Sequence, residues 1–264
     1  MKAYLDFIIP EGEKIDGGRF DLTPEIWRHL YNDSKIDRKF NEYLRGKKVI
    51  IVGPASYMLE KESADFIESF DVVVRLNRGW NVKEELKKNL GARTDVRYHC
   101  GMEHENNGGA WNIQGMLDYG VQWAAIQFPR NLDYFHNDVL NFEKLNSEYQ
   151  MNRHVWSDLE LYMTIHHYLG TRISIGTAAF TDLIFYDVER LHVSGITFLQ
   201  DGWYKGYKQR EYFNDKEYMK EDLWKDKLDV GGHAMTPQIK LLNLIRECDD
   251  RLTVDKEMEQ YLKV

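Results

Sequence analysis

Two short runs of small residues have the composition of loops that hold an anionic ligand. The first, GPAS, covers residues 53–56 and follows the apolar run Val49–Val52, while the second, SIGT, covers residues 174–177. A glycine beside the start of a helix can offer backbone N–H groups to a phosphate, and serine or threonine hydroxyls add further donors. Each run could equally be a plain turn into a helix. The presence of both in one chain favours a nucleotide, with one loop at each of its ends.

A polar residue follows the second predicted strand at the equivalent point. Val72–Leu76 has the composition of a buried strand, and Asn77 comes directly after it. In an open parallel sheet, ligands bind beyond the carboxyl ends of the strands. We therefore expect Gly53, Ser56 and Asn77 to lie at one edge of the sheet, and we interpret that edge as a nucleotide site.

One histidine has a setting that suits acid–base chemistry. Two glycines precede His233, and a helix is predicted to start near Pro237. Near neutral pH an imidazole is the natural general base, although a lone histidine can also be structural. His166 and His167 are adjacent on a predicted helix, where only one of them can face inward, and we interpret both as structural.

Several common catalytic motifs are missing from the sequence. The 53–56 run lacks the G-x-G-x-x-G of a dinucleotide fold and the G-K-S/T of a P-loop. The chain contains no D-x-D, and its histidines lack the spacing of metal ligands. We therefore expect no metal site and no resident cofactor, which argues against a metal-dependent enzyme acting on sugar nucleotides.

The composition limits the cellular compartment and the classes of partner that we expect for the protein. Lys and Arg number 35 against 43 Asp and Glu, a net charge of -8, so no overall positive field attracts nucleic acid or an anionic membrane. The two cysteines, Cys100 and Cys248, cannot form a disulfide framework. No apolar run approaches the roughly 18 residues that span a bilayer. These features predict a soluble cytoplasmic protein without a membrane partner.

Alternating strand and helix patterns predict an α/β fold with a mainly parallel sheet flanked by helices. The strands are expected at Tyr4–Ile9, Val49–Val52, Val72–Leu76, within Gly91–Cys100, Trp123–Phe128 and Arg190–Ser194. Helices are expected at Thr23–Tyr31, Glu60–Ser69, Asn81–Asn89, Ile113–Tyr119, Asn131–Tyr149, Ser157–Tyr168 (capped by Ser157), Ala178–Tyr186, from about Pro237, and Thr253–Leu262. The polar stretch Glu103–Gly109 is a surface loop or a substrate lid. The length suits one main domain, 46–264, with an N-terminal extension, 1–45, packed on it.

Three stretches, in order, resemble the motifs of one enzyme family. The strand, loop and helix that lead to VVVRLNR, with GARTDVR after them, resemble the large sialylmotif of animal-type sialyltransferases. SIGTAAFTDLIFYDVERLHVSGITF is similar to the small sialylmotif, and GGHAMTPQ resembles the last motif. The resemblance extends over Lys47–Leu244 and implies a Rossmann-like, single-domain sialyltransferase variant.

The resemblance also implies roles for individual residues. Its donor-binding positions fall on Gly53, Ser56, Asn77, Ser174, Gly176 and Thr177. His233 takes the place of the catalytic base, and Tyr212 is expected to help stabilise the leaving phosphate. The family's aromatic motif is matched only loosely, by residues 212–215 or by Trp203 and Tyr204.

The chain departs from the family at three further points. Gln238 stands near the place of a glutamate in the last motif, which leaves the role of this position open. The family's disulfide between the large and small motifs cannot form, because neither cysteine lies at those positions. The small motif's glycine also fits only with a shift of one residue.

The resemblance implies an inverting, metal-independent transfer of sialic acid or a related ulosonic acid from a CMP-sugar donor to a hydroxyl acceptor such as a glycan. Three alternatives remain open from the sequence. The first is a glycosyltransferase with another nucleotide sugar or an unusual acceptor such as a modified nucleobase. The second is an inactive nucleotide- or sugar-binding module, and the third is a Rossmann-type methyltransferase, which would prefer adenosine compounds.

Overall fold

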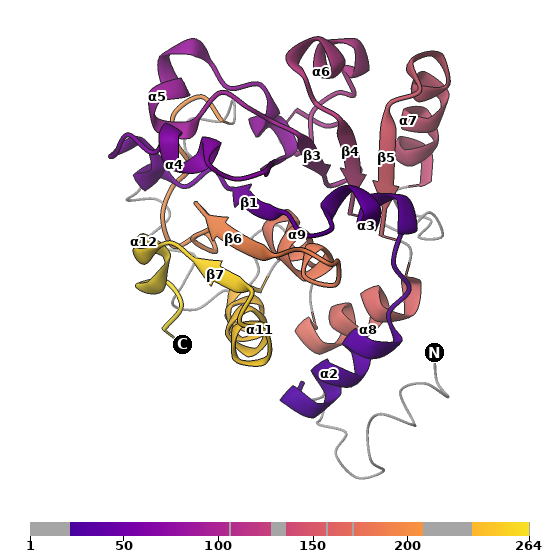
Figure 1. Ribbon diagram of the computed structural model, residues 1–264, viewed down its shortest axis with the longest axis vertical. Coiled ribbons are helices and arrows are strands. Elements are labelled where there is room, and N and C mark those ends of the chain that lie inside the picture. Colours follow the sequence, from indigo (N-terminus) through magenta and orange to yellow (C-terminus); the bar gives the residue numbers. More distant parts are fainter. Residues whose placement is uncertain are drawn as a thin grey trace.

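The computed structural model describes residues 22–105, 107–127, 136–156, 158–170, 172–207 and 234–263 (Figure 1). The strand expected at Tyr4–Ile9 lies outside these residues. A seven-stranded sheet, in the order β5-β4-β3-β2-β1-β6-β7, forms the centre of the described molecule, and every strand pair is parallel. The strands are β1 Lys48–Val52, β2 Val72–Leu76, β3 Val96–His99, β4 Trp123–Ile126, β5 Asn152–Val155, β6 Arg190–Ser194 and β7 Leu252–Val254. The predicted α/β fold with a parallel sheet is confirmed.

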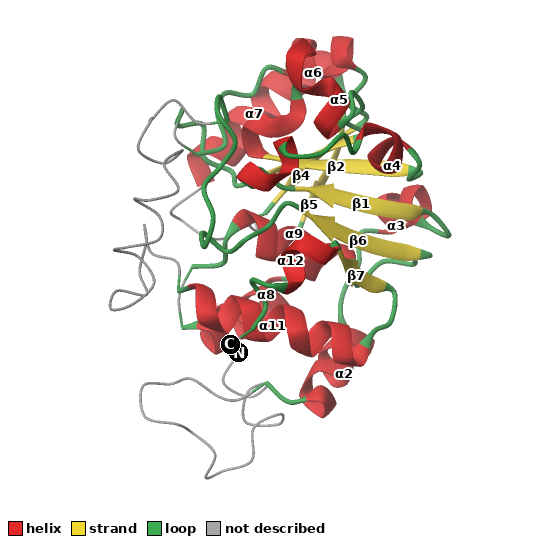
Figure 2. Cartoon of the chain, turned by 90° about the vertical axis from the view of Figure 1, so that its left-hand side faces the viewer, coloured by secondary structure: helices red, strands yellow, loops and turns green. Residues whose placement is uncertain are grey.

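Helices cover both faces of this sheet (Figure 2). They are α2 Pro24–Asp33, α3 Arg38–Leu44, α4 Ala64–Glu68, α5 Lys87–Leu90, α6 Ile113–Tyr119, α7 His136–Tyr149, α8 Leu159–Leu169, α9 Ile175–Leu183, α11 Met235–Cys248 and α12 Lys256–Glu259. Short 3₁₀ turns lie at η1 Ser56–Leu59, η2 Asn77–Trp80 and η3 Glu84–Leu86. Because strands such as β2 are buried at every position, both faces need this cover.

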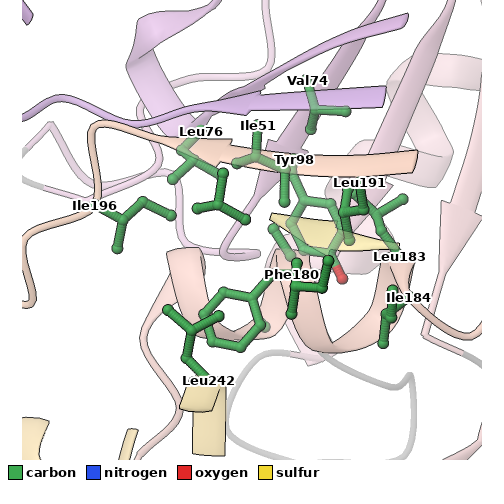
Figure 3. Packing of buried hydrophobic residues seen from close by; sticks show 14 of the residues in the cluster. Ile51, Val74, Leu76, Tyr98, Phe180, Leu183, Ile184, Leu191, Ile196 and Leu242 are labelled. Carbon is green, nitrogen blue, oxygen red and sulfur yellow. The ribbon is translucent and has the colours of Figure 1, made fainter. Parts of the chain in front are cut away.

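The main core lies between the central strands and two helices. Phe180 of α9 and Leu242 of α11 pack beneath Ile51 and Leu191 of β1 and β6, and all four side chains are 0% exposed (Figure 3). A second apolar cluster joins β4 to α6 and α7 through residues that include Ile126, Met116 and Phe142. The first core therefore fixes α9 directly against the central strands.

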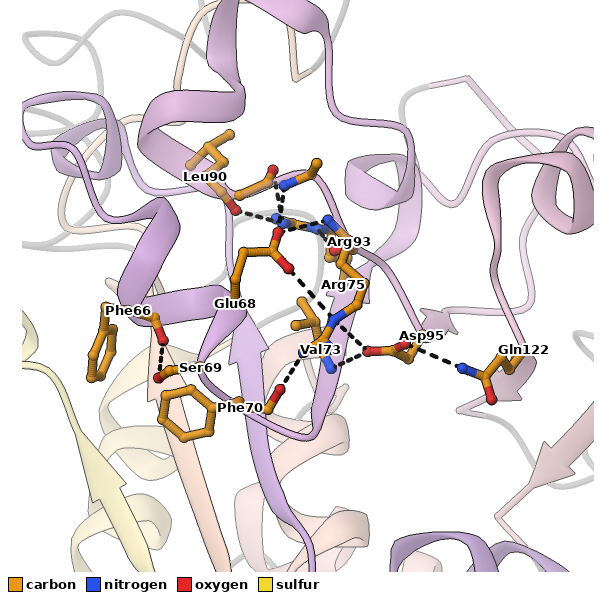
Figure 4. Close-up of polar contacts among 12 residues, drawn as sticks. Phe66, Glu68, Ser69, Phe70, Val73, Arg75, Leu90, Arg93, Asp95 and Gln122 are labelled. Atoms are coloured by element: carbon orange, nitrogen blue, oxygen red, sulfur yellow. Dashed lines mark hydrogen bonds and ion pairs between the residues drawn. The ribbon is translucent and has the colours of Figure 1, made fainter.

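Buried polar groups set the register of β2 and β3. Glu68 Oε1 accepts the backbone N–H groups of Ala92 and Arg93, and Arg75 donates to the carbonyl oxygen of Leu90 (Figure 4). Asp95 Oδ2 accepts the N–H of Val73 at 2.7 Å. The 91–97 segment, which resembles the end of the large sialylmotif, is thus bound to the strand that precedes Asn77.

Several predicted elements end at different residues. Of the helix expected at Glu60–Ser69, only α4, Ala64–Glu68, is helical, and η1 ends before it at Leu59. Asn89 Nδ2 donates to the carbonyl oxygens of Leu59 and Lys61, which holds the stretch between η1 and α4 out of a helix. Similarly, only η3 and α5 occupy the helix expected at Asn81–Asn89.

Two helices also begin differently from the prediction. The cap of α8 is Asp158, which accepts the N–H of Leu161, while Ser157 lies outside the described residues. Ser174 caps α9 directly, so the predicted 174–177 loop is in fact the first turn of that helix.

Both edge strands were missed by the sequence prediction. β5 reads NRHV and β7 reads LTV, so neither has the long apolar run that identifies a central strand. The helix predicted at Thr253–Leu262 is replaced by β7 and the four-residue α12.

The N-terminal helices pack on the sheet domain. Trp27 of α2 lies against Phe185 at 5.1 Å between ring centroids, and Phe40 of α3 stacks on His154 of β5 at 4.5 Å. The domain division at residues 45 and 46 stays a prediction. None of the helices in the described part of the chain is long and apolar enough to cross a membrane.

Candidate active site

The order of the strands reverses at β1. From β1 the chain adds β2 to β5 on one side, and then returns to place β6 and β7 on the other. In doubly wound sheets, ligands bind outside the carboxyl ends of the strands at this reversal point. The residues that leave β1 and β6 there are Gly53 and Gly195.

Gly53 and Gly195 bring the two strand exits into close contact. The N–H of Gly53 donates to Ser194 O at 2.7 Å, and the N–H of Ala55 donates to Gly195 O at 3.0 Å. A Cβ atom on Gly53 would lie 2.2 Å from Gly195 O, and Gly195 itself has a φ of +74°. Neither position accommodates a side chain, because the first would clash and the second would be strained.

The loop after β1 uses its donors within the protein. The N–H of Ser56 donates to Gly202 O at 2.8 Å, and the Ser56 hydroxyl donates to Asp201 Oδ2 at 2.6 Å. Together with the Gly53 and Ala55 bonds, these contacts occupy the N–H groups that we expected to face an anion. The Ser56 oxygen keeps lone pairs, so toward a ligand it is a hydrogen-bond acceptor.

Asn77 lies at the same edge of the sheet, at the end of β2. It is 7% exposed, its φ of 50° is one that asparagine tolerates, and its Oδ1 accepts the N–H of Cys100 at 2.9 Å. Gly53, Ser56 and Asn77 therefore share one edge, as the parallel register requires. Their role as ligands for a nucleotide stays a prediction.

The first turn of α9 lies beside the loop that follows β1. A Cβ atom on Gly176 would lie 2.9 Å from Ile196 Cδ1, and one on Gly53 would lie 2.8 Å from Ile196 Cγ1. Ile196, which follows β6, therefore packs against both glycines. This residue, which the sequence analysis did not single out, is what brings the two predicted loops together.

Two N–H groups of this turn have no partner within the described chain. Ser174 Oγ accepts the N–H of Thr177, and Gln238 Oε1 accepts the N–H of Ser174. The N–H groups of Ile175 and Gly176 remain, as expected for the first residues of a helix. Together with the positive end of the helix dipole, such N–H groups can bind an anion. The Thr177 side chain is 0% exposed and bonds to Gln238, so it lies beneath this surface.

The loop after β3 is held by hydrogen bonds from two buried side chains of that strand, Arg97 and His99. Arg97, 1% exposed, donates to the carbonyl oxygens of Asn77 and Gly108, and burial lowers its pKa to about 9. His99 bonds Gly109 O through Nε2 and accepts the N–H of Gly101 at Nδ1. Burial, and then the charge of Arg97, hold the pKa of His99 well below its usual range, so the ring is neutral. Of the two interpretations of residues 103–109, these contacts favour an anchored surface loop.

Aromatic residues of the segment after β6 lie over the β1 loop. Trp203 pairs with Ala55 in an isolated antiparallel bridge, and the N–H of Tyr204 donates to Pro54 O at 2.9 Å. Tyr207 donates its hydroxyl to Leu76 O at 3.3 Å. The alternative aromatic match, Trp203 and Tyr204, is therefore at the candidate site.

Both predicted catalytic residues, His233 and Tyr212, lie outside the described residues. The next residue in the chain, Ala234, is the N-cap of α11. Among the described residues, no group of three or more His, Cys, Asp and Glu could hold a metal ion.

Comparison with solved structures identifies relatives of this fold. The sialyltransferase CstII in complex with CMP superposes with a TM-score of 0.54 at 16% identity, over 79% of this chain and 80% of that one. CstII from Campylobacter jejuni with the analogue CMP-3FNeuAc gives 0.50 at 19% identity, again over 79% and 80%. This chain has the sialyltransferase fold.

A mammalian sialyltransferase in complex with Gal-beta-1-3GalNAc-ortho-nitrophenol also shares the sialyltransferase fold. Its TM-score is 0.50 at 11% identity, over 87% of this chain and 78% of that one. No family model and no curated protein matches the sequence. The similarity is therefore carried by the arrangement of the elements.

Proposed function

We propose that the protein is an inverting, metal-independent glycosyltransferase that transfers sialic acid or a related ulosonic acid from a CMP-sugar to a hydroxyl acceptor such as a glycan. The observation that carries the proposal is the sialyltransferase fold, in which the residues that resemble the sialylmotifs converge on the reversal point of the sheet. Gly53, Asn77 and Gly176 all lie at that edge.

The chemical step is a direct displacement. His233 takes the proton of the acceptor hydroxyl while that oxygen attacks the anomeric carbon, and the bond from this carbon to the CMP phosphate oxygen breaks. Attack from the face opposite the leaving group inverts the configuration. General-base catalysis of this kind contributes roughly 10²- to 10⁴-fold.

The hydrogen-bonding groups of the two loops support one orientation of the nucleotide. The leaving phosphate is an acceptor only, so it needs the free N–H groups of Ile175 and Gly176, with the Tyr212 hydroxyl as a further donor. The Ser56 oxygen, whose hydrogen is donated to Asp201, suits a hydroxyl or amino group of the nucleoside. This division gives each of the two loops, expected at opposite ends of the nucleotide, its own part of that ligand.

Substitution of His233 tests the assignment of the base. The His233→Ala protein should bind CMP with unchanged affinity and lose transfer from CMP-N-acetylneuraminic acid by roughly 10²-fold or more, because only the proton acceptor is removed. Calorimetric titration with CMP and release of CMP during turnover measure the two properties. His167→Ala, on α8, is the matched control and should retain activity. Transfer by His233→Ala at near the parental rate would refute the assignment.

A further inference from the structure

Gln238 joins the two helix starts that form the candidate site. It is the fourth residue of α11, and its side chain is 0% exposed. Its Oε1 accepts the N–H of Ser174 at 3.0 Å and the hydroxyl of Thr177 at 2.6 Å. Its Nε2 donates to Ala234 O at 2.9 Å. One buried amide therefore connects the N-cap of α11 to the first turn of α9.

The partners determine which way this amide points. The N–H of Ser174 can only donate and the carbonyl of Ala234 can only accept, so the oxygen must face α9 and the nitrogen must face Ala234. A carboxylate has no hydrogen to donate and would place an oxygen against Ala234 O. The position therefore needs a neutral amide, and an isosteric glutamate would break one of its bonds.

The Gln238 amide also determines which hydroxyl group donates to which in the first turn of α9. Because Thr177 gives its hydroxyl hydrogen to Gln238, the 2.9 Å contact between the hydroxyls must run from Ser174 to Thr177. Ser174 Oγ in turn accepts the N–H of Thr177. Every donor of Ser174 and Thr177 is thus used internally, which leaves the N–H groups of Ile175 and Gly176 as the ones that face a ligand.

We propose that Gln238 is a positioning residue that holds the residue before α11 at a fixed distance from the phosphate-binding turn of α9. The inference rests on the proposed function, because His233 directly precedes Ala234 and one peptide unit spans only about 3.8 Å between Cα atoms. Gln238 thereby fixes Ala234, the neighbour of the proposed base, relative to a donor bound at the first turn of α9.

The isosteric Gln238→Glu variant tests this role. We expect kcat to fall on the order of 10- to 100-fold while CMP affinity changes little, because misplacement of a base by an ångström slows the chemical step without removing ligand contacts. The ratio of variant to parental kcat should rise as the pH is lowered, since a protonated glutamic acid regains a donor for Ala234 O. A residue that only stabilises the fold would not produce this pH dependence.

Gln200→Glu is the matched control. Gln200 Nε2 also donates to a backbone carbonyl, that of Tyr261, at 2.6 Å, but near α12. It should lose a similar hydrogen bond and leave kcat unchanged. If Gln238→Glu has the parental kcat in an active enzyme, or if Gln200→Glu loses as much, the positioning role is refuted.

Hydrogen–deuterium exchange separates this inference from the proposed function. In Gln238→Glu, exchange should accelerate in both the 173–178 and the 234–239 segments, whether or not the protein is a sialyltransferase. Unchanged exchange in both segments would show that the Gln238 side chain does not join the two helix starts. A parental protein that shows the joint yet neither binds CMP nor turns over CMP-N-acetylneuraminic acid would refute the proposed function, and with it the positioning role.

Discussion

His154 lies buried between two carboxylates, and this arrangement makes it a cation. Its Nε2 is 2.8 Å from Asp182 of α9 and its Nδ1 is 3.4 Å from Asp37, which caps α3. Both ring nitrogens face groups that can accept from them, so both carry hydrogen. Burial lowers the pKa of His154, but Asp182 and Asp37 outweigh it and raise the pKa from 6.5 to about 9.

The protonation of His154 predicts a loss of stability in alkali. The folded pKa exceeds the unfolded one, so the contribution is fully present below about pH 6.5 and disappears as the pH rises through about 9. It amounts to on the order of 3 kcal/mol. The difference in unfolding free energy between the parent and His154→Gln, measured by urea denaturation, should therefore shrink between pH 7 and 10.

His192 provides a contrasting control at the same scale. It is 8% exposed, and burial lowers its pKa. Its contribution is therefore present above about pH 6.5 and is lost as the pH falls, the opposite of His154. Equal pH dependence for His154→Gln and His192→Gln would contradict the charge assigned to His154.

Residue types and strand order identified the candidate positions but not their bonding. The sequence placed Gly53, Ser56 and Asn77 at one edge from the parallel rule alone. It could not show that Ser56 donates to Asp201, 145 residues away, or that Thr177 bonds Gln238 across 61 residues. Such contacts depend on how distant segments meet, which no local pattern encodes.

At the scale of elements, the contact between the exits of β1 and β6 defines the site. Gly53→Ala would place Cβ 2.2 Å from the backbone oxygen of Gly195, which has no side chain that could move aside. We expect this variant to lose about 1–3 kcal/mol of stability and to bind CMP more weakly, because the two exits must separate. Thermal unfolding and calorimetric titration measure both effects.

Gly79→Ala is the control for the loss of a glycine's backbone freedom where no close contact is made. Its Cβ would lie 3.5 Å from Tyr207 Cε2, an ordinary contact. It should cost little stability, since no close approach is disturbed. If the two alanine variants are equally stable, the contact between Gly53 and Gly195 does not constrain the site.

The sequence predicted strands correctly where burial on both faces favours apolar residues. β2 and β6 match their predicted ranges to the residue, and both are buried strands with neighbours on both sides. The edge strands β5 and β7 are short and partly polar, and they pair because the rest of the sheet presents an open edge. The residue pattern within β5 or β7 alone does not indicate the strand with which it pairs.

At the scale of the whole molecule, the fold and the net charge limit how the proposed nucleotide can be held. The net charge of -8 leaves no global positive field, so a nucleotide must be bound by local groups such as the start of α9. The sialyltransferase fold supplies such a place at the reversal of the sheet. The resemblance of the motifs and the fold both support the proposed CMP-sugar donor.

Nucleotide selectivity in the absence of metal tests the proposed donor most sharply. Thermal unfolding should be followed with CMP, UMP, UDP and S-adenosylhomocysteine, because a ligand at 100 times its Kd stabilises the folded state by about 2.7 kcal/mol. An enzyme with a CMP-sugar donor should be stabilised selectively by CMP. A preference for UDP would change the donor, and a response to the adenosine compound alone would contradict the proposed function.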